Sequence, residues 1–242
     1  MIRKILVLGS KGMLGNAVCK YFLKRNDVQL YAIDTERWPT DEFKKFVTKE
    51  NHDFIINCIG AIPQKKNIFE INYSLPIWLC GLSKTKVIHP GTDCELDNDE
   101  YGLSKKKARD YIINNSNNTK IIKTSIIGHE VNTNYSLLDW FLNSKKTVSG
   151  FSKVYWNGNT TLQWAKFCIL LINNWNLYQK ENIIRTKCIS KFELLGIIKD
   201  VYNHEIKIKI HSGFKNNKCL SGGDRMPNIK QQLIELKDFY SF

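Results

Sequence analysis

Tyr101 and Lys105 are the residues of this sequence whose types and spacing point most directly to catalysis. They are four positions apart, so on a helix both side chains lie on one face. A nearby ammonium favours phenolate over phenol, and we therefore expect Lys105 to lower the pKa of Tyr101. Tyr101 would give a proton to a carbonyl oxygen while a hydride reaches the carbonyl carbon. The alternative is an amphipathic surface pair without a chemical role.

A glycine-rich loop is the second group of residues with chemical meaning, because it follows a short apolar run and opens a helical pattern. We expect Gly9 to permit a tight turn, Gly12 to admit a pyrophosphate to the backbone, and Gly15 to let helix and strand pack closely. The pyrophosphate would lie at free N–H groups and the positive end of the helix dipole. The predicted contacts to a dinucleotide come from Gly9, Lys11, Gly12, Met13 and Leu14.

Asp34 ends the next apolar run, 19 residues after Gly15, where a carboxylate can bind a ribose hydroxyl. Asp34 favours a free 2′-hydroxyl, as in NAD, whereas Arg37 could reach the 2′-phosphate of NADP. The alternative to a dinucleotide site is an ordinary strand-to-helix turn with chance glycines.

Alternating strands and helices must position these residues. Continuous apolar runs predict buried parallel strands at residues 5–8, 28–33, 54–57, 86–89 and 120–124. Helical spacing predicts helices at residues 13–24, 40–49, 69–82 and 102–114. Such alternation is typical of an α/β fold with a doubly wound parallel sheet. The regular alternation of strand and helix patterns ends after about residue 150, so we expect a main domain at residues 1–150 and a smaller lobe at residues 151–242.

The loop spacing G-x-x-G-x-x-G resembles that of the extended short-chain dehydrogenase/reductase superfamily, and four other segments agree. Asn57-Cys58-Ile59-Gly60-Ala61 looks like its N-x-A-A segment, and Gly91-Thr92-Asp93 resembles its S-T-D segment. Tyr101-Gly102-Leu103-Ser104-Lys105 matches Y-G-x-S-K, and Ile122-Lys123-Thr124-Ser125 resembles I-R-T-S. The resemblance implies that Cys58, Ile59, Gly60 and Ala61 line the cofactor, that Lys105 binds the nicotinamide ribose, and that Thr92 orients the carbonyl.

Within this superfamily the chain is most similar to the dTDP-4-dehydrorhamnose reductase group, since Asn72-Tyr73-Ser74-Leu75-Pro76 fits the V-N-A-x-x-P-x-x-L helix of that group. The resemblance is good up to about residue 128 and weaker beyond it. It implies a Rossmann-type fold with a small C-terminal substrate-binding lobe, and NAD or NADP in the reduced form as cofactor. The implied activity is reduction of a nucleotide-linked 4-keto-6-deoxy sugar for surface polysaccharide or glycan synthesis.

One departure from the family bears on activity. Only eight residues separate Thr92 from Tyr101, where the family has a longer loop. The short loop can still join a strand end to a helix start. It can also displace Thr92 beyond hydrogen-bond reach, and small misplacements are costly in catalysis. A non-catalytic NAD(P)-binding regulatory subunit of the same fold is therefore the alternative function.

Three residues of the second half are candidates for substrate binding. The Trp156 indole could stack on a nucleobase or sugar, and Asn157 could bind sugar hydroxyls. Arg225, in Arg225-Met226-Pro227-Asn228, loosely resembles the R-P-x-N segment of the reductase group. The alternative for Trp156 and Asn157 is a turn before a helix capped by Asn159, Thr160 or Thr161.

Composition narrows the function classes further. A formal net charge of +13 is consistent with a nucleic-acid partner, but without a long basic block we favour a solvated lysine surface. Seven scattered cysteines without a C-x-x-C pair predict free thiols in a reducing compartment, and no cluster has metal-ligand spacing. No apolar run is long enough to cross a membrane. We expect a cytoplasmic protein that binds no metal, membrane or nucleic acid and could form a homodimer.

Overall fold

A parallel β-sheet of seven strands is the main feature of the computed structural model, which describes residues 2–33, 37–65 and 68–241. The strand order is β14-β10-β5-β4-β3-β1-β2. The strands are β1 (Arg3–Leu8), β2 (Val28–Ile33), β3 (Phe54–Asn57), β4 (Lys86–Gly91), β5 (Thr119–Lys123), β10 (Glu181–Arg185) and β14 (Asp224–Arg225). The pairings among β1 to β5 are parallel. The predicted doubly wound α/β fold is confirmed.

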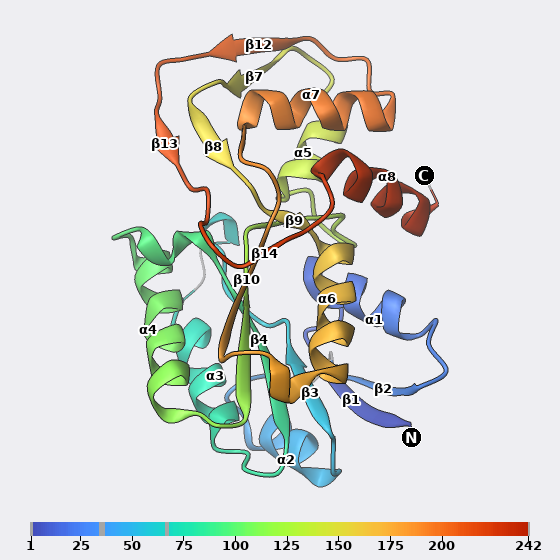
Figure 1. Ribbon diagram of the computed structural model, residues 1–242, viewed down its shortest axis with the longest axis vertical. Helices are drawn as coiled ribbons and strands as arrows, with labels where there is room; N and C mark the ends of the chain where they lie inside the picture. The colour runs from blue at the N-terminus through green and yellow to red at the C-terminus, as the bar shows by residue number, and fades with distance from the viewer. Residues whose placement is uncertain (1, 34–36, 66–67, 242) are drawn as a thin grey trace. The chain divides into compact units, whose positions relative to one another are not determined.

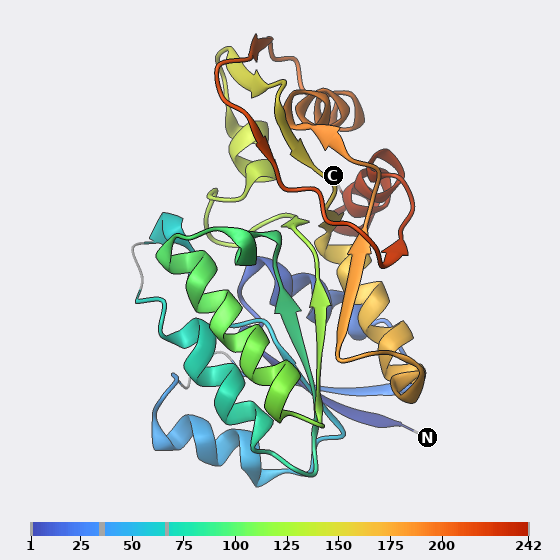
Figure 2. The same cartoon turned by 60° about the vertical axis from the view of Figure 1, so that its left-hand side comes forward.

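Helices cover both faces of this sheet (Figures 1 and 2). The helices are α1 (Met13–Phe22), α2 (Asp41–Lys49), α3 (Ile71–Cys80), α4 (Glu100–Asn115) and α6 (Thr161–Asn173). Helices α2, α3 and α4 lie on one face, and α1 and α6 lie on the other. The four apolar residues of β1 from Ile5 to Leu8 are each 0% exposed, as expected for a strand covered on both sides.

The sheet order places the end of β1 beside the end of β3. The chain leaves β1 for β2 on one side and then returns to add β3 on the other. Such a switch point opens a crevice at the carboxyl ends of the strands, where ligands bind in this class of fold. Gly9 follows β1 and Cys58 follows β3, so the glycine loop and the segment Asn57–Ala61 meet there.

The chain divides into two compact units whose boundaries differ from the division expected near residue 150. The first unit contains residues 1–123 and 165–182, and the second contains residues 124–164 and 183–242. Helix α6 begins in the second unit and continues in the first. The chain thus passes between the units three times. A change of pattern along the sequence indicates a single boundary and does not predict such returns.

Besides the start of α6, the described part of the second unit consists of short strands and three helices. Its other strands are β6 (Ile126–Ile127), β7 (Val148–Phe151), β8 (Val154–Trp156), β9 (Asn159–Thr160), β11 (Ile189–Ser190), β12 (Ile208–His211) and β13 (Asn216–Asn217). The helices are α5 (Leu137–Asn143), α7 (Lys191–Tyr202) and α8 (Ile229–Tyr240). A polar cluster links α5 and α7: the His129 ring is 2.7 Å from the Asp139 carboxylate and 2.8 Å from the Tyr202 hydroxyl.

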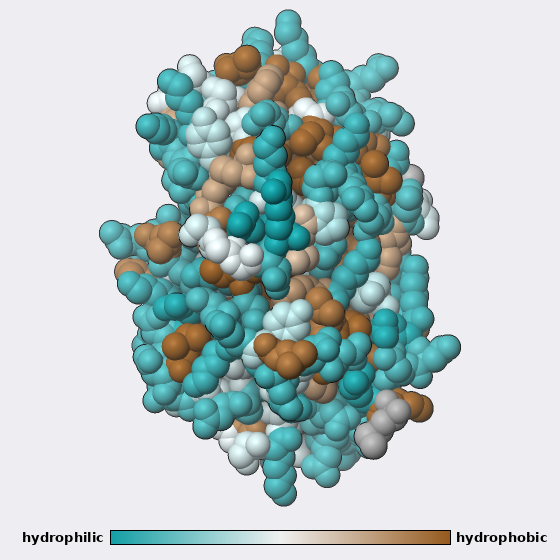
Figure 3. Space-filling model, viewed as in Figure 1, coloured by the Kyte–Doolittle hydropathy of each residue, from teal (hydrophilic) through white to brown (hydrophobic). Residues whose placement is uncertain are grey.

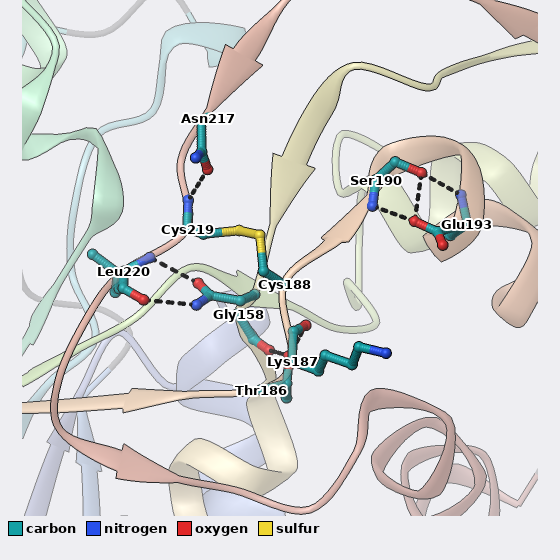
Figure 4. Close-up of a disulfide and its surroundings, with 10 residues drawn as sticks. Gly158, Thr186, Lys187, Cys188, Ser190, Glu193, Asn217, Cys219 and Leu220 are labelled. Carbon is teal, nitrogen blue, oxygen red and sulfur yellow. Dashed lines mark hydrogen bonds between the residues drawn. A yellow bond between two sulfur atoms is a disulfide. The ribbon is translucent and has the colours of Figure 1, made fainter.

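A disulfide joins Cys188 to Cys219, which are 31 positions apart in the sequence, with a Cα–Cα distance of 5.9 Å (Figure 4). Strand β8 pairs with both β11 and β13, and these pairings bring the two cysteines together. The expectation of free thiols is wrong for these two residues. The other five cysteines, Cys19, Cys58, Cys80, Cys94 and Cys168, are free.

The surface in Figure 3 is mainly hydrophilic, with hydrophobic residues distributed over it. Large apolar side chains such as Leu96 and Leu177, each at least 80% exposed, stand singly in the sequence, as is normal for surfaces of globular proteins. In the residues described, no helix has the length and apolar character needed to cross a membrane.

Candidate active site

The glycine loop has the backbone geometry expected for a pyrophosphate site. Gly9 has a φ of +77°, which favours glycine. A Cβ on Gly15 would lie 2.1 Å from the Gly9 carbonyl oxygen, so Gly15 allows α1 to lie against the loop. A Cβ on Gly12 would meet only that oxygen, at 3.4 Å, among the described atoms beyond its chain neighbours. The fold requires Gly9 and Gly15, whereas the space beside Gly12 is open.

Gly12 is also the N-cap of α1, and no described side chain caps that helix end. The first-turn N–H groups of a helix have no partners within the helix. Together with the helix dipole they can bind an anion. Lys11 is exposed, whereas Met13 is half-buried and Leu14 is buried. Asp34 lies outside the described residues.

The segment after β3 is held by side chains that sequence reasoning did not assign. The Asn72 carboxamide of α3 accepts a hydrogen bond from the Ala61 N–H (2.8 Å) and donates to the Ala61 carbonyl (3.1 Å). Asn72 also donates to the Ser104 hydroxyl at 3.0 Å. The Asn57 side chain accepts from the Ile59 N–H at 3.0 Å. These bonds fix Cys58 to Ala61 relative to α4.

Thr92, Tyr101 and Lys105 come together at the end of β4. Thr92, the residue after β4, lies close enough to Tyr101 for its side chain to oppose in part the rise that burial causes in the pKa of Tyr101. Helix α4 carries Tyr101 and Lys105 one turn apart, and the Lys105 ammonium donates to the Pro90 carbonyl at 3.0 Å. The Phe69 ring contacts the Tyr101 ring edge to face, with ring centroids 5.8 Å apart.

Burial decides the protonation states of these groups. Burial raises the pKa of Tyr101 above its ordinary value; Cys94 and Asp93 add to the rise, and the Thr92 hydrogen bond only partly opposes it. The expectation that Lys105 lowers the pKa of Tyr101 is therefore wrong. Burial also lowers the pKa of Lys105 to about 8, against the opposing effects of Glu95 and Cys94. Near neutral pH the site thus holds a phenol and an ammonium, and the phenol can donate a proton.

The short loop between Thr92 and Tyr101 forms a 3₁₀-helix, η2 (Asp93–Leu96), with Thr92 as its N-cap. The loop approaches α4 closely at Gly102, where a Cβ would lie 2.4 Å from the Cys94 carbonyl oxygen. Asp99 caps α4 by accepting a hydrogen bond from the Gly102 N–H at 2.6 Å. The glycine of the Y-G-x-S-K segment therefore lets the loop of eight residues after Thr92 lie directly against the start of α4.

The candidate substrate residues lie in the second unit and have structural contacts there. Trp156 is 1% exposed. The Asn157 carboxamide donates to the Leu220 carbonyl (2.8 Å) and accepts from the Leu220 N–H (3.0 Å). Arg225 is exposed and belongs to β14. The alternative prediction, that a residue after Trp156 and Asn157 caps the next helix, is confirmed for Thr160: its hydroxyl accepts a hydrogen bond from the Gln163 N–H at 3.2 Å. Sugar binding by Trp156, Asn157 or Arg225 stays a prediction.

The sequence carried a partial signal for two of the residues that were missed, Asn72 and Ser104, and none for Glu95. Asn72 and Ser104 belong to segments that matched family patterns, but no pattern states that their side chains bond to each other. In the sequence Glu95 is one of several acidic loop residues, yet it is only 4% exposed.

Within the described ranges, no group of three or more His, Cys, Asp or Glu side chains could hold a metal ion.

No protein-family model and no curated protein matches the sequence. Solved structures do match the fold. The dTDP-4-dehydrorhamnose reductase of Clostridium acetobutylicum aligns with a TM-score of 0.82 at 17% identity, over 99% of this chain and 100% of that chain. The same enzyme from Bacillus anthracis, in complex with NADP, gives 0.82 at 15% identity over 100% of both chains.

A third solved structure has a different substrate. The GDP-mannoheptose C4 reductase of Campylobacter jejuni, with NADP bound, gives a TM-score of 0.70 at 16% identity over 100% of this chain and 99% of that chain. At these identities the comparisons establish the fold. The resemblance to the Rossmann-type fold of the dTDP-4-dehydrorhamnose reductases, predicted from short motifs, is confirmed over the whole chain.

Proposed function

We propose that this chain is an NAD(P)H-dependent reductase of the extended short-chain dehydrogenase/reductase type that acts on a sugar nucleotide. Its substrate would be a nucleotide-linked 4-keto-6-deoxy sugar, in the synthesis of a surface polysaccharide or glycan. The observation that carries the proposal is the position of helix α4, which bears Tyr101 and Lys105, against the end of β4 and the loop after Thr92. The Lys105 ammonium donates to the Pro90 carbonyl of β4, and Gly102 lies against the Cys94 carbonyl of the loop. Solved structures with the same fold include sugar-nucleotide enzymes, several with NAD or NADP bound.

The residues present fit a dinucleotide. The open space beside Gly12, which a side chain would fill, and the uncapped N-terminus of α1 would take the pyrophosphate. Gly9, Lys11, Met13 and Leu14 would surround it, and Cys58 to Ala61 would line the nicotinamide half. When bound, the reduced cofactor would supply the hydride for the carbonyl carbon.

The protein side chains would then handle the proton. Thr92 would donate a hydrogen bond to the substrate carbonyl oxygen and orient it. Tyr101, kept protonated by burial, would transfer its phenolic proton to that oxygen. Lys105, still charged below pH about 8, would stabilise the resulting phenolate and bind the nicotinamide ribose. Trp156, Asn157 and Arg225 remain the proposed contacts to the sugar nucleotide.

The decisive experiment is single-turnover reduction of UDP-, dTDP-, GDP- and CDP-linked 4-keto sugars with NADH or NADPH. Tyr101→Phe removes one oxygen and should lower the rate by about 10² to 10⁴-fold, the usual cost of losing a general acid. Tyr111→Phe is the matched control, because Tyr111 belongs to the same helix and is 38% exposed. It should leave the rate unchanged.

The rival function, a dinucleotide-binding regulatory subunit, predicts a different pattern. It requires normal cofactor binding, no turnover of any of the four substrate classes, and indifference to Tyr101→Phe. Its main support was the short loop, but this loop forms η2 and lies against the start of α4, which supports a position of Thr92 near Tyr101. A wild-type protein that binds cofactor and reduces none of the substrates would nevertheless favour the subunit.

A further inference from the structure

The two carboxylate oxygens of Glu95, in the short loop, bind different partners. Its Oε1 atom accepts a hydrogen bond from the Thr92 N–H at 3.0 Å, while the Thr92 hydroxyl accepts one from the Cys94 N–H at 3.2 Å. These bonds form a capping box around η2, which satisfies N–H groups that would otherwise lack partners. The carboxylate thus holds the backbone of Thr92 directly.

The second oxygen of Glu95 forms an ion pair. Oε2 lies 2.6 Å from the Lys123 ammonium, and the side chains of Glu95 and Lys123 are 3% and 11% exposed. Lys123 is also 3.6 Å from Glu181, which forms two hydrogen bonds of 2.9 and 3.0 Å with the Arg109 guanidinium. A buried carboxylate needs such a partner. The loop is therefore tied through Lys123 to the end of β5 and the start of β10.

Space for this carboxylate comes from Gly91. A Cβ at Gly91 would lie 3.2 Å from Glu95 Oε1 and 2.8 Å from the Ile121 side chain. Gly91 is the last residue of β4 and directly precedes Thr92. Together with Gly102, it allows the acidic loop to lie against the sheet and helix α4.

We propose that Glu95, held by Lys123, is a positioning residue that fixes Thr92 beside Tyr101. This role rests on the proposed reductase function. Glu95 does not need to touch the substrate, because it acts through the Thr92 backbone. The ion pair with Lys123 ties this carboxylate to β5 and so restrains the loop that carries it.

The charge of Glu95 has a consequence that a purely structural role would lack. Among the described residues, Glu95 and Cys94 of η2 and His89 of β4 interact electrostatically with the Lys105 ammonium. Tyr101 lies one turn earlier on α4. Glu95 raises the pKa of Lys105, which burial lowers to about 8. Replacing Glu95 by neutral glutamine should therefore move the loss of the Lys105 charge to lower pH.

The test uses Glu95→Gln and Lys123→Met in the full chain. Each should lower kcat for the 4-keto sugar about 10 to 10²-fold, because misplacing a catalytic group is costly, while dinucleotide affinity stays the same. The alkaline limb of the rate profile should move to lower pH in Glu95→Gln. Lys123→Arg keeps the charge and should retain most of the activity.

Glu193→Gln is the matched control. Glu193 closes a capping box with Ser190 at the start of α7, with a bond of 2.7 Å from the Ser190 N–H (Figure 4). Glutamine can still accept the bond from the Ser190 N–H, so this variant removes a capping-box carboxylate charge away from Thr92, and kcat should not change. A double-mutant cycle adds the remaining control: in a Thr92→Val background, Glu95→Gln should have little further effect, because it acts through Thr92.

Several outcomes would overturn the proposal. One is a Glu95→Gln protein with the wild-type kcat and pH profile; another is Glu95→Gln and Thr92→Val effects that multiply. Hydrogen exchange of the Thr92 amide, followed by NMR, gives a readout that does not need turnover. Faster exchange in Glu95→Gln supports the positioning role, and equal exchange overturns it. If wild type reduces no substrate while the exchange differs, the reductase function fails but the tie between Glu95 and Thr92 stands.

Discussion

The glycine loop allows a test that separates what the fold needs from what a cofactor needs. Gly12→Val places a side chain in space where the nearest described neighbour of its Cβ, the Gly9 oxygen, is 3.4 Å away. The φ of Gly12 is −79°, which valine accepts. Loss of the glycine N-cap should therefore cost only about 0.5–1 kcal/mol. The fold should persist.

Binding of the dinucleotide should not persist in Gly12→Val. The new side chain would occupy the place of the pyrophosphate at the start of α1. Losing two hydrogen bonds to a charged group, at about 1.5–3 kcal/mol each, corresponds to at least about 10²-fold in affinity. Isothermal titration calorimetry with NADH and NADPH measures this loss, and thermal unfolding followed by circular dichroism measures stability.

Gly15→Ala is the companion variant with the opposite expectation. Its Cβ would lie 2.1 Å from the Gly9 carbonyl oxygen, so the backbone must move by about 1 Å, and such overpacking costs about 1–3 kcal/mol. For a chain of this size that is a fall in Tm of about 2–4 °C per kcal/mol. A folded Gly12→Val protein with unchanged cofactor affinity would refute the pyrophosphate assignment. A Gly15→Ala protein as stable as wild type would refute the packing argument.

Three further predictions concern the cofactor, the pH dependence and the disulfide. Asp34 should give a modest preference for NADH, because its carboxylate would repel a 2′-phosphate; clearly tighter NADPH binding in a direct titration would shift attention to Arg37 and Lys11. Burial lowers the pKa of Lys105 from 10.5 to about 8, so between these pH values the unfolded chain binds more protons than the folded chain. The free energy of unfolding should therefore rise with pH across this window, by about 3 kcal/mol relative to that of Lys105→Met. The same loss of charge should reduce kcat/KM above pH about 8, and a flat alkaline profile would contradict it. Cys219→Ser opens a loop of 31 positions and should lower the free energy of unfolding by about 3–4 kcal/mol in urea titrations, whereas Cys80→Ser, at a free cysteine, should cost less.

Much of the main sheet and its ligand loop was predictable from the sequence, because the signals are local. An apolar run such as Ile5–Leu8 must be buried on both faces, and the structure has it in β1. The spacing of Tyr101 and Lys105 places both on one face of α4, whatever surrounds that helix. The order strand, glycine loop, helix likewise depends on neighbouring residues alone. These features follow from backbone geometry over fewer than about 15 residues.

Tertiary structure decided the contacts that hold the site together. Glu95 and Lys123 are 28 positions apart, Asn72 and Ser104 are 32 apart, and Cys188 and Cys219 are 31 apart. No periodicity relates residues at such separations, and each pair meets only because neighbouring strands and helices align. Burial is a tertiary property as well. It raises the pKa of Tyr101, whereas the spacing of four residues between Tyr101 and Lys105 had predicted a lower pKa. The sequence thus determined which groups lie near the end of β4, while the packing around them determined their distances and their charge.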